Sequence, residues 1–436
     1  LCSAAISLNF IPLFMFKEPR HQGEGSDWNP GQVLWGAIKG LLEPRLFFFT
    51  ISFAGFWLMF YQLFDILPNF IDDWIDSRAL AASAERMSVG LLGIVVLGVI
   101  ALGRMVILRS EDRRMSGIEK AVYLGLGGLL LIAVLATRLS GGAMTLGVPT
   151  INGGNMTQEW MINVNAFFIS IIAFFIGWLT GKVRSLQAIV IGIAISAVAI
   201  YALGMSMNGW WTLGAILLFS LGEMSASPTK MRYLAAIAPK GKEGLYMGYV
   251  NFTVGIGWSI GSIIAGNMYQ EGGDKVELAR KYLVEEQGMA QEAAMAIDRA
   301  EVMDVFQGEV GVDAFEAREV LWEAYQPYDM WLVFTLIGLA SMLGIIIYDK
   351  VTRAAAANPG HAFNVKGGQI VTVALAPIAA AFWWYFWELT ANQGKGLDEA
   401  LAVIVQAVMF TGMFLISLFS PYKDPGTGAP AASDAD

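Results

Sequence analysis

Long apolar runs constrain the fold of this chain more than any other feature. Ten segments of about 20 residues or more consist mostly of apolar side chains, so each could cross the hydrocarbon core of a bilayer as a helix. A spanning segment must satisfy its own backbone hydrogen bonds in lipid, and a run of this length does so as an α-helix. We therefore predict an all-α polytopic membrane protein. The predicted spans are 46–71, 86–108, 117–138, 159–180, 185–206, 210–228, 244–268, 329–348, 369–388 and 400–420.

The first residues of the sequence are also apolar. Segment 1–16 lacks the basic start of a signal peptide, and we interpret it as the end of a truncated transmembrane helix. With this partial segment, about 11 transmembrane segments are expected.

Composition agrees with a membrane protein and argues against most catalytic chemistry. Charged residues make up 15% of the chain, whereas a soluble domain contains about 25%. Cys2 is the only cysteine, so an internal disulfide is excluded, and His21 and His361 are the only histidines. We found no nucleophile beside a base and no cluster of metal ligands. We therefore predict that the chain is not an enzyme and has no catalytic residue, metal site, cofactor or nucleic-acid partner.

The distribution of Lys and Arg predicts the orientation in the membrane. Loops 17–45, 104–120 and 229–243 contain more Lys and Arg than most of the loops expected on the opposite side of the membrane. This excess places them in the cytoplasm. Alternation then puts the C-terminus in the cytoplasm. The tail 421–436 is rich in Pro, Gly and Ala and is predicted to be disordered. We expect a multi-pass protein of the plasma (inner) membrane.

The loop 269–328 is the largest predicted segment outside the bilayer. From Glu271 to Asp329 it has 15 acidic residues against five basic ones. Asp274 followed by Glu277 is a capping-box pattern at a helix start. We expect two or three short helices packed on the membrane domain, forming a solvated acidic cap on the extracytoplasmic side. A role in binding a partner or gathering cations is the alternative.

Glu223 is the most unusual residue of the predicted membrane helices. It lies in LLFSLGEMSASPTKMRYLAAIAPK, at 217–240. A carboxylate inside a membrane helix costs about 2.5–3.5 kcal/mol on insertion scales, and such groups face a water-filled cavity or a partner. Pro228 lacks a backbone donor and is expected to bend or stop the helix, with Ser227 able to bond the freed carbonyls. Lys230 and the basic residues after it are expected to hold the cytoplasmic side. A structural ion pair with another helix is the alternative role for Glu223.

Further polar and small residues suggest a site around Glu223. Asp65 lies on the same predicted helix face as Gln62, nearer the outer end, where it could line a cavity or lie at the interface. Asn165 lies near the outer start of the next core span. Gly257 and Gly261 form a small-xxx-small pair, which is typical of close helix packing. A hinge at Gly257 is the alternative.

Several of these motifs resemble helices 7, 8, 10 and 11 of the proton-dependent oligopeptide transporters, a branch of the major facilitator superfamily. LGEMSASP followed by LAAIAPKGKEGLYMGYVNFTVGIG resembles helices 10 and 11, FWLMFYQ at 56–62 resembles helix 7, and INVNAFF resembles helix 8. The matching residues are Gly222, Glu223, Ser227, Pro228, Ala238, Pro239, Met247, Gly248, Ile256 and Gly257, with Phe56, Trp57 and Gln62 in helix 7 and Asn165 in helix 8.

The resemblance implies the fold and the roles of individual residues. It implies the C-terminal half of the superfamily bundle, with helix 7 at 46–71, helices 8–11 at 159–268 and helix 12 at 329–348. The hairpin 86–138 and the two helices at 369–420 are additions to the family pattern. In the family, residues at the positions of Glu223, Gln62 and Asn165 line the central cavity. Trp258 stands where the family has Asn, and we include it, with Asp65 and Ser227, among the candidate binding residues.

The function implied is secondary active transport by alternating access. The expected partners are a proton and a small peptide or another small polar solute, carried by a monomeric transport unit in the lipid bilayer. The alternative is a sensor or scaffold with the same fold that acts through the acidic loop.

Overall fold

The computed structural model describes residues 30–142, 145–151, 153–397, 400–420 and 422. The predicted partial helix at 1–16 and almost all of the tail 421–436 lie outside this range. The chain divides into two units, residues 1–40 and 41–436. The described residues of the first unit, 30–40, belong to α3 (Pro30–Leu41). This helix begins at a proline, a residue favoured at the first position of a helix.

The second unit confirms the all-α polytopic fold. Within the described residues, eight segments are long and apolar enough to cross a membrane. They are α4–α5 (Pro44–Asp65), α8 (Val89–Ser110), α9 (Gly117–Leu139), α10 (Gln158–Gly181), α11 (Ser185–Leu203), α18 (Asp329–Ala357), the segment Ala362–Asn392 and α21 (Leu401–Phe419). The other two predicted spans are the long helices α12 (Gly209–Ile237) and α13 (Glu243–Gly272), whose composition is more polar.

The first predicted span, 46–71, is three helices instead of one. α4 (Pro44–Phe60) is followed by the single turn α5 (Gln62–Asp65) and then by α6 (Leu67–Trp74). Pro68 lies in the first turn of α6 and has no N–H to continue the hydrogen bonding of the preceding turn. The prediction of a single helix was therefore wrong. This proline explains the break between α5 and α6, whereas the break between α4 and α5 lies earlier, at Tyr61.

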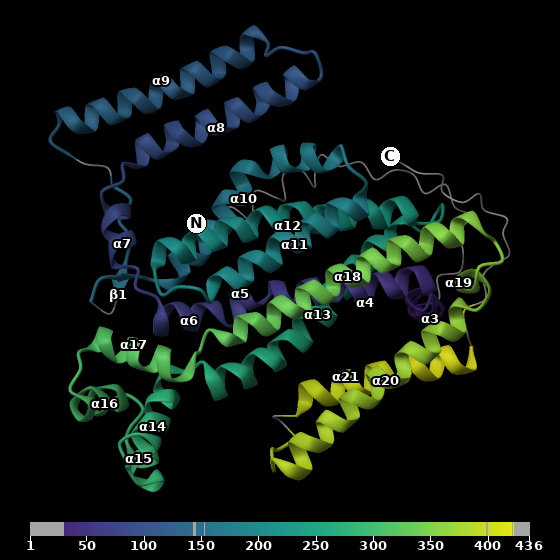
Figure 1. Cartoon of the computed structure of the whole chain (residues 1–436). Helices are drawn as coiled ribbons and strands as arrows, with labels where there is room; N and C mark the ends of the chain where they lie inside the picture. Colours follow the sequence, from purple (N-terminus) through teal and green to yellow (C-terminus); the bar gives the residue numbers. More distant parts are fainter. Residues whose placement is uncertain (1–29, 143–144, 152, 398–399, 421, 423–436) are drawn as a thin grey trace. The chain divides into compact units, whose positions relative to one another are not determined.

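Six of the long helices form the core of the bundle. α11 packs against α12 and α18, α4 packs against α13 and α18, and α10 packs against α12 (Figure 1). Glycines permit the closest of these contacts. A Cβ at Gly222 of α12 would lie 2.7 Å from the backbone nitrogen of Ser196 in α11, so the two helices touch through their backbones.

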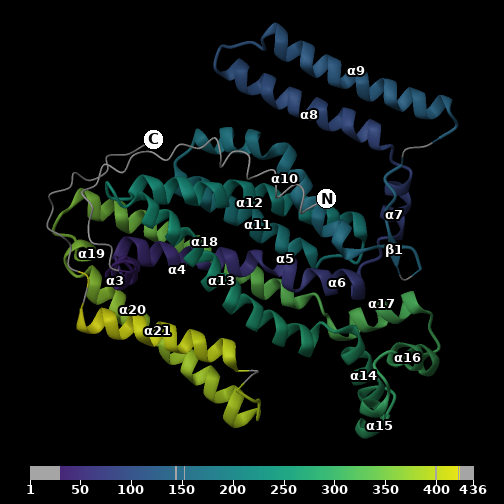
Figure 2. The same ribbon diagram turned by 180° about the vertical axis from the view of Figure 1, so that it is seen from behind.

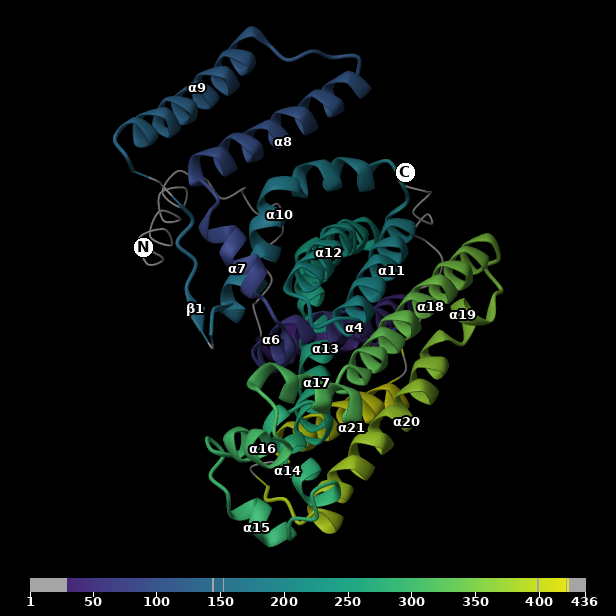
Figure 3. The same cartoon turned by 60° about the vertical axis from the view of Figure 1, so that its left-hand side comes forward.

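The inserted hairpin consists of α8 and α9, which pack on each other and meet the bundle where α8 contacts α10 (Figure 3). The helix α7 (Arg78–Glu85) precedes it, and the short strands β1 (Thr150–Ile151) and β2 (Asn155–Met156) follow it. The strands pair antiparallel, with Thr150 opposite Met156. No residue of α9 is buried, as expected for a helix surrounded by lipid.

The two C-terminal helices pack side by side and are bonded to α13 through polar side chains. α20 (Gly367–Trp387) and α21 run together (Figure 2) and follow the short helix α19 (Ala362–Val365), while the π-helix η1 (Glu388–Asn392) extends α20. The amide of Gln406 in α21 donates to Ser259 of α13 at 2.6 Å. Interhelical hydrogen bonds of this kind stabilise the packing of membrane helices. They matter because lipid tails are as apolar as the helix surfaces, so the hydrophobic effect does not drive the helices together.

The acidic loop folds into four short helices, where two or three were predicted. They are α14 (Lys275–Glu285), α15 (Gln291–Ala296), α16 (Val302–Val310) and α17 (Ala314–Tyr325). Asp274 caps α14, but Glu277 bonds Arg280 and Arg299, and the complete capping box belongs to Asp313 at the start of α17.

This acidic cap is attached to the bundle by aromatic packing. The ring of Trp322 in α17 lies 5.9 Å from Phe70 and 5.8 Å from Trp74, both in α6. The indole N–H of Trp74 donates to the carbonyl of Gly273 at 2.9 Å. The cap therefore shares one hydrophobic core with the membrane helices.

Candidate functional site

Glu223 and Asn165 are in direct contact. The carboxylate of Glu223, on α12, accepts a hydrogen bond of 3.2 Å from the side-chain amide of Asn165, on α10. The carbonyl oxygen of Asn165 accepts in turn from the hydroxyl of Ser220 at 2.5 Å. This second bond fixes the amide so that its N–H₂ group faces the carboxylate. Among the described residues, no Lys or Arg forms an ion pair with Glu223.

The helix that carries Glu223 continues past the predicted break. α12 passes through Pro228 and ends at Ile237, immediately before Ala238 and Pro239. The prediction that Pro228 could stop the helix was therefore wrong. Its ring is exposed, and a helix can continue past a proline by bending locally. Ser227, one turn beyond Glu223, is half-buried.

Lys230 lies inside the bundle, not at its cytoplasmic surface as predicted. Only 1% of its surface is exposed. Its ammonium lies 3.3 Å from the hydroxyl of Thr253 and 3.4 Å from the carbonyl of Val250, both on α13. It also lies 4.4 Å from the centre of the Trp57 ring, on α4. The signal that could have found it is the seven-residue spacing from Glu223, which places both side chains on one face of a helix.

Asp65 and Gln62 both contact α13. The carboxylate of Asp65 accepts from the hydroxyl of Ser262 at 2.7 Å. Gln62 is fully buried, and its amide donates to the carbonyl of Leu58, one turn earlier, at 2.7 Å. Its side-chain oxygen has no hydrogen-bond partner among the described residues. The structure thus joins Glu223 to Asn165 by a hydrogen bond but does not join either residue to Gln62 in this way.

Trp258 forms an aromatic pair with Tyr61. The two rings are stacked with their centres 4.7 Å apart, and half of the surface of Trp258 is exposed. Tyr61 lies near the carboxylates of both Asp65 and Glu223. The pair therefore lies in an environment where aromatic faces and carboxylates favour a cation.

Gly257 lies at the closest contact between α13 and α4. A Cβ at this position would be 2.4 Å from the carbonyl oxygen of Ala54 and 2.8 Å from the backbone nitrogen of Leu58. This geometry supports the close-packing interpretation, and a hinge at Gly257 stays a prediction.

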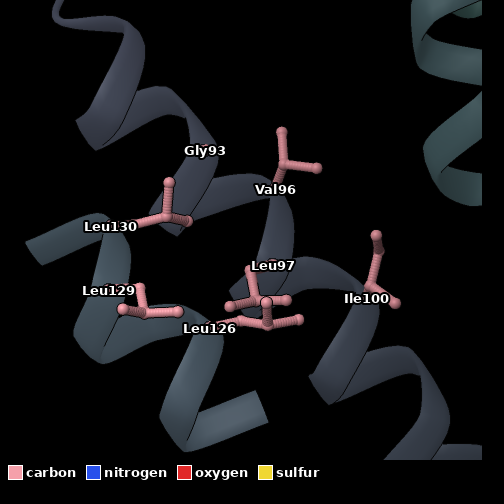
Figure 4. A pocket seen from close by; sticks show the side chains of 7 residues that line it. All are labelled: Gly93, Val96, Leu97, Ile100, Leu126, Leu129 and Leu130. Carbon is pink, nitrogen blue, oxygen red and sulfur yellow. The ribbon is translucent and has the colours of Figure 1, made fainter. Parts of the chain in front are cut away.

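Cavities lie elsewhere in the described part of the second unit. One, of about 360 Å³, separates α8 from α9 (Figure 4) and is lined by Gly93, Val96, Leu97, Ile100, Leu126, Leu129 and Leu130. Its lining offers no polar side chain to a polar solute. The other, of about 190 Å³, lies between α13 and the C-terminal helices and includes Ser262, Asn267, Tyr385 and Lys395. In the part of the chain that the structure describes, no three His, Cys, Asp or Glu residues lie together as a metal site.

The comparisons with known proteins agree with this architecture. Residues 137–273, which include α10, α11, α12 and α13, match the family model of the Major Facilitator Superfamily. The match covers less than half of the chain, and the polytopic all-α fold is consistent with it.

One relative among curated proteins is the multidrug resistance protein MdtH of Edwardsiella ictaluri (strain 93-146). It is 26% identical over 126 residues, which are 29% of this chain and 31% of the relative. The match thus spans less than a third of the length of that relative. The comparison with solved structures found no significant match.

Proposed function

We propose that this chain forms part of a secondary active transporter that moves a small polar solute across the plasma membrane by alternating access. Glu223 binds the cationic group of the solute or a proton, and exchange at this carboxylate couples proton movement to solute movement. Small peptides are the solute class that the helix 10 and 11 motifs favour. The transport unit is a monomer, and the C-terminus lies in the cytoplasm.

The observation that carries the proposal is the carboxylate of Glu223. It lies inside the bundle, its described bond is to a neutral amide, and no Lys or Arg in the described residues is paired with it. A charge that only neutral groups stabilise in a membrane helix favours binding of a cation or a proton. The superfamily match over 137–273 includes this residue and supports the transporter class.

Replacing Glu223 tests this function. In the intact protein reconstituted in liposomes, Glu223→Gln is expected to reduce uptake of labelled dipeptides at least tenfold, because the amide carries no charge and exchanges no proton. The dependence of the remaining uptake on pH should be lost. The measurement is initial uptake rate between pH 5 and pH 8 under an imposed proton gradient.

Two controls make this result specific. Glu243→Gln changes an exposed glutamate near the start of α13 and should leave uptake unchanged. Glu223→Asp keeps the charge and should retain part of the activity. If Glu223→Gln shows the same uptake and pH dependence as the wild type, Glu223 does not bind the proton or the cationic group of the solute.

Export of organic cations is a second candidate, which the stacked pair Tyr61 and Trp258 favours. The matched relative is named a multidrug resistance protein, which supports a drug-like solute as the second candidate. This function predicts that cells expressing the intact protein accumulate less ethidium, and that Trp258→Ala abolishes the difference. Dipeptide uptake with no effect on ethidium would exclude it.

A further inference from the structure

Lys230 is a buried cation that forms no ion pair with any residue the structure describes. Its contacts are a hydroxyl, a carbonyl and two aromatic rings. Lysines near helix ends usually extend their ammonium group to the water interface. Here the ammonium turns inward. An unpaired charge in a membrane interior is costly and is a functional candidate when it is kept.

A donor close to Lys230 lacks an acceptor among the described residues. The indole N–H of Trp57 is buried and has no hydrogen-bond partner among the described residues. The ring of the same tryptophan lies under the ammonium of Lys230. The two oxygen contacts of Lys230, at 3.3 and 3.4 Å, are long for charged hydrogen bonds. The cluster therefore has more donors than acceptors, which favours a ligand with an anionic group.

Lys230 and Glu223 lie on one face of α12. Seven residues are two helical turns, so the two Cα atoms are about 10 Å apart along the helix axis. α4 runs along this face. The ring of Phe60 is 5.5 Å from Phe219 at one end, and Trp57 lies against Lys230 at the other. One helix face thus presents a carboxylate and, two turns away, an ammonium.

We propose that Lys230, together with the indole N–H of Trp57, binds the anionic group of the solute while Glu223 binds its cationic group. This inference rests on the proposed function and narrows its substrate class to solutes that carry both charges. An extended dipeptide places its ammonium and carboxylate about 7 Å apart, since each residue spans about 3.5 Å. That length is within reach of two side chains whose backbone positions are about 10 Å apart.

Because aromatic rings cover the ammonium of Lys230, a conformational change must expose it before a solute binds. Phe53 and Trp57 of α4 cover the ammonium, so α4 must shift relative to α12 before a solute reaches it. Pro228 lies between the two charged residues and removes one backbone hydrogen bond from the helix there. The segment that carries Lys230 can therefore tilt relative to the segment that carries Glu223.

The experiment uses three probes that differ only in charge. They are alanyl-alanine, which has both charges, alanyl-alanine amide, which lacks the carboxylate, and N-acetyl-alanyl-alanine, which lacks the ammonium. Labelled forms are taken up by the intact protein in liposomes. The wild type is expected to prefer alanyl-alanine over the amide at least tenfold. Lys230→Gln should remove this preference while retaining uptake of the amide, and Lys230→Arg should keep the preference.

Matched variants separate binding from folding. Lys240→Gln removes an exposed lysine from the same region and should leave the preference unchanged. Trp57→Phe keeps an aromatic ring but removes the N–H and part of the indole, and should weaken the preference less than Lys230→Gln does. Thermal unfolding of each purified variant gives its stability. If Lys230→Gln does not fold, Lys230→Met, whose side chain is similar in length to lysine, takes its place in the comparison.

Each outcome decides between the two proposals. Uptake that depends on Glu223 but shows the same preference in Lys230→Gln as in the wild type overturns the role of Lys230 and leaves the transport function standing. Equal loss of all three probes in a folded Lys230→Gln protein means a structural role and also overturns it. Uptake of none of the probes by the wild type overturns this inference together with the peptide class of solute.

Discussion

Replacing Gly257 with alanine is expected to separate α13 from α4 and to destabilise the bundle by about 1–3 kcal/mol, as overpacking of a tight contact does. The new Cβ would lie 2.4 Å from the carbonyl oxygen of Ala54 and 2.8 Å from the nitrogen of Leu58. Both are backbone atoms, so the conflict cannot be relieved by rotating a side chain. The helices must move apart, which also displaces Trp258 from its stack on Tyr61.

The same helix provides the control for this prediction. Gly255, two residues earlier, is exposed, and a Cβ there would meet no atom within 4 Å. Gly255→Ala should therefore keep or slightly raise the stability, because alanine favours a helix over glycine by about 1 kcal/mol. The melting temperature of the purified protein, followed by Trp fluorescence, measures both variants. Equal melting temperatures for Gly257→Ala and Gly255→Ala would contradict the contact.

Replacing Trp74 with alanine is expected to loosen the acidic cap at a cost of about 3–5 kcal/mol, the range for removing a buried tryptophan. Its side chain is fully buried, packs against Trp322 of α17 and donates a hydrogen bond to Gly273 at the end of α13. Without Trp74, α17 loses a packing contact with α6, and the backbone just before α14 loses a hydrogen bond. Limited proteolysis should then cut within 269–328 at least ten times faster than in the wild type.

Two variants separate the parts of this effect. Trp74→Phe keeps an aromatic ring but removes the N–H and part of the indole, so it should show an intermediate increase in cleavage. Trp384→Ala removes a tryptophan that is 62% exposed on α20 and should leave cleavage of the cap unchanged. A cleavage rate in Trp74→Ala that matches the wild type would show that the cap is held by other contacts.

The candidate site was only partly predictable. Glu223 stands out in the sequence because it is a carboxylate in an otherwise apolar helix. The resemblance in helices 8 and 10 pointed to Asn165, and the structure places its amide in a hydrogen bond with Glu223. Lys230 was misplaced because the sequence offers two explanations for a lysine after a proline. It could end a helix at the membrane surface or continue that helix inward, and the choice depends on the contacts of α12 with α4 and α13.

The sequence by itself determined the class of architecture. The length of an apolar run and its need to satisfy backbone hydrogen bonds in lipid are local properties, so the spans could be predicted from residues that are neighbours along the chain. The tertiary structure alone decided which helix faces meet. It brought Trp57 of α4 beneath Lys230 of α12 and made the helix continue past Pro228, because these outcomes depend on packing between segments that are far apart in the sequence.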